Sequence, residues 1–330
     1  MKKPIQKSRL LWILLVLLGA GLFISFLHGP VKTSFTDLWN FLIHKDQTYA
    51  TIFIDLRLPR IVLAFLVGAS LSLSGAILQG YFQNPMAGPF VVGVSSGASF
   101  GAVLSIFLGW NIQFFGLSLQ NVFAFASGFA LVSFVYILSQ RKGVYKVETL
   151  LLTGIAAGAL ASSLTSFLIF FKSESFKQAV FWLLGSFALS DWNQVNAVFP
   201  YFLLCFVGAE WLAKEMNLLV LGDETAQSLG CPVNRVRKIF LALATLLAAA
   251  SVSVSGIIGF VGLIIPHWVR ILIGPDHRNL FIFSSLMGGT FLIYSDLLAR
   301  SLLFPTELPI GIITAVVGAP FFIYLLNQRR

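Results

Sequence analysis

Long apolar runs, each close to the length that crosses a bilayer, fill most of this 330-residue chain. A transmembrane helix needs about 20 mostly apolar residues, because each residue advances the helix by about 1.5 Å across a hydrocarbon layer about 30 Å thick. The pattern predicts an all-α polytopic membrane protein with ten transmembrane helices. We place them near residues 10–28, 60–81, 92–109, 121–139, 148–171, 195–213, 236–256, 257–274, 279–301 and 308–326.

Two places depart from a simple series of spans. The seventh and eighth runs are nearly continuous, and Gly256, Gly259 and Gly262 mark where we expect the helix to break. The apolar piece Ala179–Leu189 is too short to cross, so we expect a half-helix that enters from the outer side. No inter-domain linker occurs, and residues 1–330 are expected to form a single transmembrane domain.

A polar segment, Gly222–Lys238, interrupts the apolar pattern after the sixth run. Acidic residues stand at its start, and a glycine and a proline follow about eight residues later, which is typical of a very short helix near 222–230. Ala226 and Leu229 are three residues apart and could form a small apolar face. Two interpretations remain open: a solvated loop with one helical turn, and a lever for a soluble motor.

Composition and charge support a membrane protein and indicate its orientation. Hydrophobic residues make up 57% of the chain and charged residues 11%, with a net charge of +9. Lysines and arginines collect in cytoplasmic loops, and ten spans with both termini in the cytoplasm place most of the 22 basic residues inside. The bilayer is therefore an expected partner. Nucleic acid is not, because a basic face on a water-soluble fold is missing.

Patterns typical of catalysis or metal binding do not occur. Cys205 and Cys231 form no CxxC pair, and the sequence contains no HExxH, no GxSxG with its partners and no GxxxxGK[ST] phosphate loop. We expect no catalytic residue, no metal site and no cofactor on this chain, so that any ATP with Mg²⁺ must be used by another polypeptide. His267 lies within a span beside Pro266, which favours packing over ligation.

Small residues recur at helical spacing in the third and fifth spans. Gly93, Gly97 and Gly101 form a tandem GxxxG, a pattern that lets helices approach closely in a membrane. Close packing within the chain is one interpretation, and a surface lining a conduit for a bulky solute is the other. For the fifth span we expect a pathway wall formed by Thr153, Gly154, Gly158, Ser162 and Ser163.

Two further features bear on transport. The sequence QNPMAGP at 83–89 prevents a continuous helix after the second span, and it predicts either a tight turn or a constriction at the mouth of a pathway. Asp296 is the clear acidic residue within a span, and Arg300 lies four residues further on, where an ion pair is expected. A secondary transporter driven by an ion gradient would need a coupling acid, and Asp296 beside Arg300 is poorly suited to that role.

Several motifs occur in the order of one known family. The segment Arg57–Leu104, RLPRIVLAFLVGASLSLSGAILQGYFQNPMAGPFVVGVSSGASFGAVL, resembles the signature of the FecCD-type permeases. These are membrane subunits of type II ABC importers for iron–siderophores, haem and cobalamin. The resemblance continues in LGDETAQSLG, in Gly259–Arg278 and in Ser295–Leu326, and so covers the chain from about Arg57 to its end.

The resemblance implies a set of partners. They are a second permease chain, identical or paralogous, two cytoplasmic ABC ATPase subunits and an extracytoplasmic substrate-binding protein. It implies a place in the bacterial plasma (inner) membrane and inward transport of an iron complex, with a ferric siderophore ahead of haem and cobalamin.

The resemblance also implies roles for particular residues. The short helix would couple to the ATPase through Gly222, Asp223, Glu224, Thr225, Ala226, Leu229 and Gly230. Docking of the binding protein would use Arg57, Arg60 and Arg300. The structural alternatives are membrane-interface anchoring for the first two and the pair with Asp296 for Arg300. A cytoplasmic gate would include Asn84, Pro85 and Met86 and, by position alone, the loop Arg141–Val147.

Overall fold

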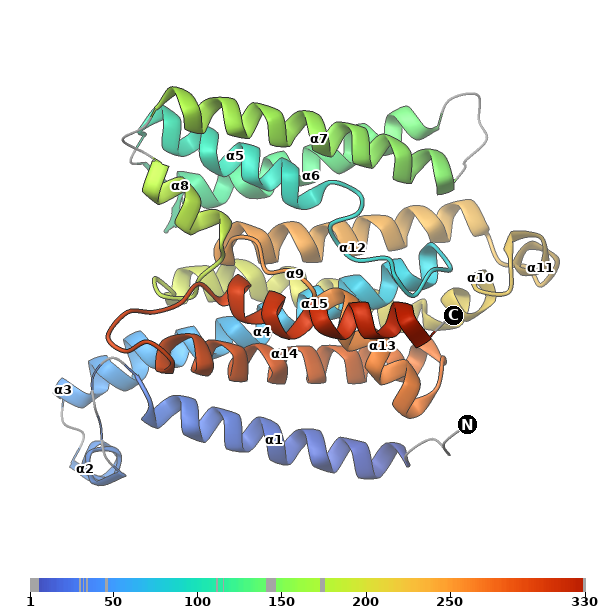
Figure 1. Ribbon diagram of the computed structural model, residues 1–330. Coiled ribbons are helices and arrows are strands. Elements are labelled where there is room, and N and C mark those ends of the chain that lie inside the picture. The colour runs from blue at the N-terminus through green and yellow to red at the C-terminus, as the bar shows by residue number, and fades with distance from the viewer. Residues whose placement is uncertain are drawn as a thin grey trace.

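A computed structural model describes residues 6–29, 31, 33, 35–44, 47–110, 112–114, 116–140, 147–172 and 176–328. The long helices run in roughly one common direction and form a bundle (Figure 1). Each of the ten predicted spans contains a helix, so the prediction of an all-α polytopic membrane protein is confirmed. These helices are α1 (Lys7–Leu27), α4 (Leu58–Tyr81), α5 (Val94–Leu108), α6 (Leu119–Ser139), α7 (Val147–Phe171), α9 (Trp192–Trp211), α12 (Val233–Ser255), α13 (Val261–Ile273), α14 (His277–Ser301) and α15 (Ile310–Gln328).

Short elements connect these helices at the two ends of the bundle. One end, which we call the hairpin end, holds a two-stranded antiparallel hairpin in which Gln113 pairs with Ser118 and Phe114 with Leu117. The other, the α11 end, holds the first and last described residues (Figure 1). Termini on one side agree with an even number of crossings. The short elements are α2 (Phe35–His44), α3 (Gln47–Ala50), the π-helix η1 (Thr51–Arg57), β1 (Gln113–Phe114), β2 (Leu117–Ser118), α8 (Phe176–Leu183), α10 (Ala213–Leu219) and α11 (Asp223–Ser228).

The predicted break between the seventh and eighth spans is confirmed. The helix α12 ends at Ser255 and is followed by Gly256, whose φ is +68°, and α13 begins after Phe260, whose φ is +67°. With 13 residues α13 is about 20 Å long, which is shorter than the hydrocarbon layer. Gly262 was expected at the break but lies inside α13, where it allows a close helix contact.

The predicted half-helix is present but shifted. It is α8 (Phe176–Leu183), at the hairpin end, and it stops earlier than expected because Gly185 adopts a φ of +73°. The sixth span also differs from a straight helix, since α9 and α10 meet at an angle of 60°. Hydropathy located the half-helix and the sixth span. The end of α8 and the angle between α9 and α10 depend on backbone angles instead.

The helix α4 lies at the centre of the bundle, between α14, α12, α13 and α9. Two of its glycines, Gly68 and Gly75, permit this position. A Cβ on Gly68 would lie 2.2 Å from the carbonyl oxygen of Gly288, and one on Gly75 would lie 1.7 Å from that of Gly262. Small residues let helix backbones approach where lipid supplies no hydrophobic driving force between spans.

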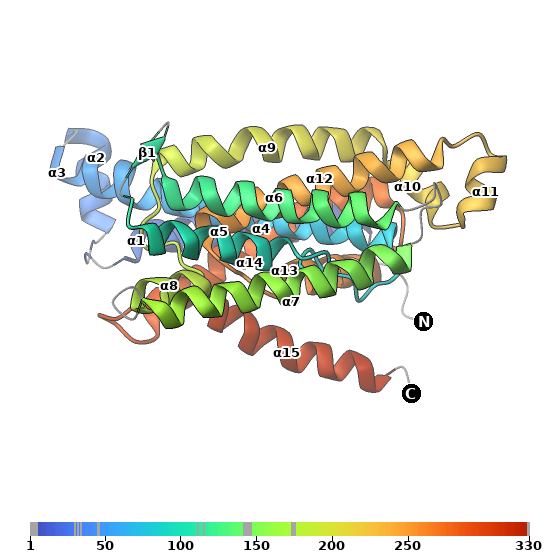
Figure 2. The ribbon, with the colours of Figure 1, turned by 90° about the horizontal axis from the view of Figure 1, so that it is seen from above.

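The helices α5, α6 and α7 pack together along one edge of the bundle (Figure 1). A Cβ on Gly97 would lie 2.7 Å from the carbonyl oxygen of Ser127, and one on Gly101 would lie 2.2 Å from that of Phe123. Both oxygens belong to α6, so the GxxxG motif serves helix packing. Seen from above, α7 and α15 lie on the same side, and α15 diverges from the bundle (Figure 2).

Candidate functional site

The short helix predicted in the polar segment is α11 (Asp223–Ser228), and it projects from its end of the bundle (Figures 1 and 2). Gly222 and Gly230 flank it with φ values of +104° and +82°, which other residues rarely adopt. Asp223, Glu224 and Thr225 are exposed on it. This arrangement confirms the helix, while its role in coupling stays a prediction.

The expectation that Ala226 and Leu229 form one apolar face is wrong. Ala226 is fully buried, whereas Leu229 is 60% exposed. Leu229 is the C-cap of α11, and its amide still donates to the carbonyl of Thr225 at 3.1 Å, but its side chain does not pack on the bundle as that of Ala226 does. Ala226 therefore holds α11 against the bundle, and Leu229 remains available to a partner.

A buried arginine joins α11 to two long helices. Arg237, on α12, places its Nη2 2.6 Å from Oδ1 of Asp223, and its Nη1 donates to the carbonyl of Tyr81 at 3.0 Å. Its guanidinium also lies 5.2 Å from the centroid of the Tyr81 ring, at the end of α4. Arg237 is only 5% exposed and acts as an internal brace.

The environment next to α11 keeps one thiol protonated. Burial raises the pKa of Cys231, and the nearby Glu215 and Asp223 raise it further.

Within the described residues, no group of three or more His, Cys, Asp and Glu side chains could hold a metal ion. The ring of His267 packs at an angle to Phe321, with 6.5 Å between the ring centroids.

The segment after α4 is a tight turn at the α11 end. Gln83 has a φ of +49°, the amide of Asn84 donates to the carbonyl of Gln79, and Asn84 Oδ1 accepts from the amide of Met86 at 2.9 Å. Asn84 is exposed, and Pro85 and Met86 are half-buried. Gln83 Nε2 also donates to the carbonyl of Leu219 at 2.7 Å, so this turn is linked to the approach to α11. Its role as a gate stays a prediction, and residues 141–146 of the other predicted gate segment lie outside the described residues.

At the hairpin end, two buried arginines share two carboxylates. Arg60 contacts Asp296 at 2.8 Å and Glu307 at 2.9 Å, and Arg300 Nε lies 3.3 Å from Asp296. The predicted pair of Asp296 with Arg300 is confirmed. The contacts of Arg60 were missed, because Arg60 and Asp296 are 236 residues apart and no periodicity connects them.

The third arginine of this cluster is held by backbone and hydroxyl groups. Arg57 donates to the carbonyls of Phe26 and Val31 and to Oγ1 of Thr33. Arg57, Arg60 and Arg300 are 4%, 8% and 6% exposed. The prediction that Arg57 and Arg60 reach out to the membrane interface as anchors is therefore wrong, because both side chains are enclosed by protein. Docking of a partner at this cluster is not tested by these contacts.

The five residues expected to line a pathway divide into two groups. Gly154 and Gly158 are buried against the start of α5, where added Cβ atoms would lie 3.2 Å from the carbonyl oxygen of Val91 and 3.3 Å from Oγ of Ser96. These two glycines therefore pack helices, and their assignment to the wall is corrected. Thr153 is half-buried, and Ser162 and Ser163 lie on the exposed face of α7.

Comparison with known proteins places this architecture among transporters. A model of the FecCD transport family matches residues 14–328. The cobalamin import system permease protein BtuC of Halobacterium salinarum is 46% identical over 86% of this chain and 75% of its own length. The hemin transport system permease protein HmuU of Yersinia pestis is 37% identical over 97% and 95%. An inward-facing structure of a transporter assigned to the metal-chelate ABC type superposes with a TM-score of 0.87 at 36% identity, covering 97% of this chain and 99% of that one.

Proposed function

Because the chain belongs to the FecCD transport family, the permeases of type II ABC importers, we propose that it moves a metal chelate inward as part of a larger assembly. The assembly contains a second permease chain, two cytoplasmic ABC ATPase subunits and an extracytoplasmic binding protein. This chain binds no cofactor, and the ATPase subunits use ATP and Mg²⁺. The α11 end faces the cytoplasm, which puts both termini inside.

One observation carries the proposal: α11 is exposed, yet it is rigidly joined to the bundle. Asp223 pairs with Arg237, and Arg237 also holds the end of α4 through Tyr81. A push on α11 is therefore transmitted at once to α12 and to the central helix. Rigid elements that shift together are a common means by which one site drives another.

The cargo we propose is a large metal chelate. A ferric siderophore is the expectation from the sequence, ahead of haem and cobalamin. The relatives described above move cobalamin and hemin by their names, and the higher identity belongs to the cobalamin permease. Uptake assays should therefore compare cyanocobalamin, hemin and a ferric hydroxamate directly.

Docking of the binding protein at Arg57, Arg60 and Arg300 is part of the proposal. Asp296 and Glu307 pair with Arg60 and Arg300, whereas Arg57 is held by uncharged groups, so the cluster keeps a positive charge at the hairpin end. Acidic groups on a partner would be attracted there, mainly through a faster association rate. Glu307 is the more accessible of the two carboxylates, with 24% of its side chain exposed, and it is the one that a partner's acid can displace.

An ion-gradient-driven secondary transporter is the competing function. It needs a membrane acid that can bind and release a coupling ion. Asp296 contacts two arginines, Arg60 and Arg300, and its side chain is 3% exposed, so it is already neutralised. Uptake by the purified chain alone in liposomes under a proton gradient would support that competing function.

The coupling step is tested by Leu229→Asp in the complete transporter, reconstituted in liposomes with its ATPase and binding protein. We expect uptake to fall at least tenfold, because a charge replaces an apolar contact with the ATPase. Leu189→Asp at the hairpin end is the matched control, since Leu189 is also exposed. Ala226→Asp is unsuitable, because it would bury a charge. Unchanged uptake in Leu229→Asp would overturn the assignment of α11.

A further inference from the structure

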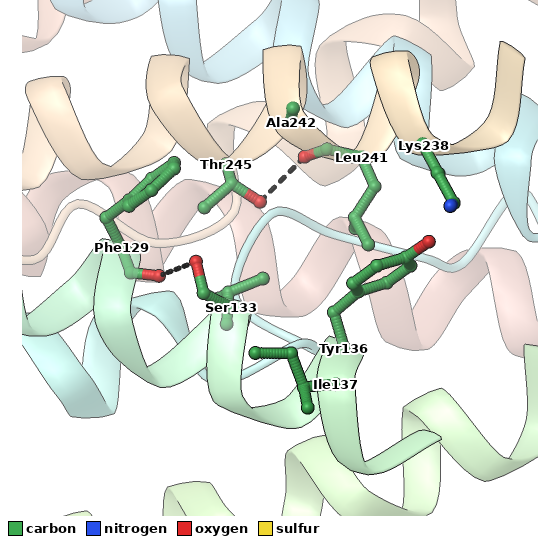
Figure 3. A pocket seen from close by; sticks show the side chains of 9 residues that line it. Phe129, Ser133, Tyr136, Ile137, Lys238, Leu241, Ala242 and Thr245 are labelled. Carbon is green, nitrogen blue, oxygen red and sulfur yellow. Dashed lines mark hydrogen bonds between the residues drawn. The ribbon is translucent and has the colours of Figure 1, made fainter. Parts of the chain in front are cut away.

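A groove runs along the surface between α6 and α12 (Figure 3). Its volume is about 230 Å³. The helix α12 contributes Lys238, Leu241, Ala242 and Thr245, at spacings of three, four and seven residues from the first. The helix α6 contributes Phe129, Val132, Ser133, Tyr136 and Ile137 with the same helical periodicity. Both sets therefore form stripes along their helices, and the groove follows the helix axes.

The walls of this groove are apolar in effect. Thr245 and Ser133 are the hydroxyl residues that line it besides Tyr136. Oγ1 of Thr245 donates to the carbonyl of Leu241 at 2.7 Å, and Oγ of Ser133 donates to that of Phe129 at 2.9 Å (Figure 3). The hydroxyl hydrogens of Ser133 and Thr245 are thus used within their own helices, and the Tyr136 hydroxyl accepts from Nε2 of Gln140. An apolar chain can lie along the groove without leaving the donors of Ser133 and Thr245 unpaired.

One end of the groove is charged and the other is not. Lys238 is the charged residue among those that line it, and it lies toward the α11 end, beyond Leu241 and opposite Tyr136 (Figure 3). Its side chain is exposed and forms no ion pair within the described part of the chain. From Lys238 to Thr245 the helix rises about 10 Å, so the apolar part extends from the charged end toward the middle of the membrane.

We propose that this groove binds one acyl chain of an anionic glycerophospholipid from the leaflet on the α11 side, with Lys238 contacting the phosphate group. The groove matches such a lipid in chemistry and position, because its apolar part lies within the bilayer and its charged end lies at the bilayer boundary. Basic sites between transmembrane helices on the cytoplasmic side bind anionic headgroups. The proposal rests on the proposed function for its orientation, with the α11 end in the cytoplasm, and is independent of the cargo.

The large metal chelate proposed as cargo does not suit this groove of about 230 Å³. The hydroxyl groups of Ser133 and Thr245 donate to their own helices and not to a molecule in the groove. Leu241 and Val132 are almost fully buried at its base. The groove also lies between α6 and α12, whereas the exposed serines of α7 face a different part of the surface. We therefore treat it as a site for lipid.

The test is native mass spectrometry of the purified full-length protein titrated with phosphatidylglycerol or phosphatidylcholine of identical acyl chains. We expect tighter binding of phosphatidylglycerol at one site. Lys238→Gln should weaken it about fivefold, the factor expected for one lysine near a lipid surface, and leave phosphatidylcholine unchanged. Ala242→Phe should fill the groove and weaken both lipids.

Two controls distinguish this site from general effects. Lys214→Gln removes a similar exposed charge at the same end, and Ala130→Phe adds a ring to an exposed position of α6 that does not line the groove. Both should bind lipid like the unaltered protein. Equal binding of the two lipids, or unchanged binding in Lys238→Gln and Ala242→Phe, would overturn the proposal. Thermal unfolding in detergent checks that each variant is folded.

Discussion

The helices α4 and α7 are both long and apolar, yet they occupy opposite kinds of position. In the most apolar stretch of the segment that contains α4, 89% of the residues are buried, against 22% for α7. The backbone of α4 touches those of α13 and α14 at glycines, whereas α7 packs against α5 and leaves one face open. Hydropathy therefore predicts which helices cross the membrane, but it does not predict which of them lies at the centre of the protein.

The difference also separates two mechanical roles. A helix enclosed on all sides and tied at both ends cannot move without its neighbours. The helix α4 is held by Arg60 at the hairpin end and by the contact of Tyr81 with Arg237 at the α11 end. The helix α7 has few such ties, and its exposed serines can face a second chain or a solute. The predictions below test this contrast.

The largest effect is expected for Gly75→Ala at the centre. The new Cβ would lie 1.7 Å from the carbonyl oxygen of Gly262, a backbone atom that cannot yield without moving α13. We expect the free energy of unfolding to fall by more than about 3 kcal/mol, the upper end of the usual cost of overpacking. Thermal unfolding in detergent measures the loss of stability. Gly19→Ala is the control, because nothing lies within 4 Å of its added Cβ. Similar stability of the two variants would contradict the central position of α4.

The next effect concerns the charges that hold α4 at the hairpin end. Asp296→Asn leaves Arg60 and Arg300 buried without their shared carboxylate, and breaking a buried pair costs about 3 kcal/mol or more. Glu307→Gln should cost about 1 kcal/mol or less, because Glu307 is partly exposed. Chemical denaturation of the two variants side by side measures both free energies. Equal losses would mean that Asp296 is not the central anion.

The smallest effect is expected on α7. In Gly158→Ala the added Cβ would lie 3.3 Å from Oγ of Ser96, a side-chain atom that can turn aside. The cost should stay below about 1 kcal/mol, and better helix propensity offsets part of it. Unfolding temperature is the measurement. A loss as large as that of Gly75→Ala would show that α7 is packed as tightly as α4.

Much of the architecture of the α11 end could be predicted, and much of the hairpin end could not. Flanking glycines and early acids located α11 to within two residues, because capping chemistry is local. The burial of Ala226 and the role of Arg237 were missed, since both depend on what a helix meets after the chain folds back. At the hairpin end the pair Asp296–Arg300 could be predicted from its spacing of four residues, but the contacts of Arg60 with Asp296 and Glu307 could not.

Length and apolar periodicity were sufficient to place a helix in each of the ten predicted spans and to locate the break near Gly256 and a short polar helix. These features follow from the energetics of each segment in its surroundings. Tertiary structure decided which helix became central, which glycines touch backbone, and which carboxylate neutralises Arg60. Those outcomes depend on contacts between residues far apart in the chain. A bilayer distinguishes apolar from polar segments, but it does not choose which apolar segments become neighbours.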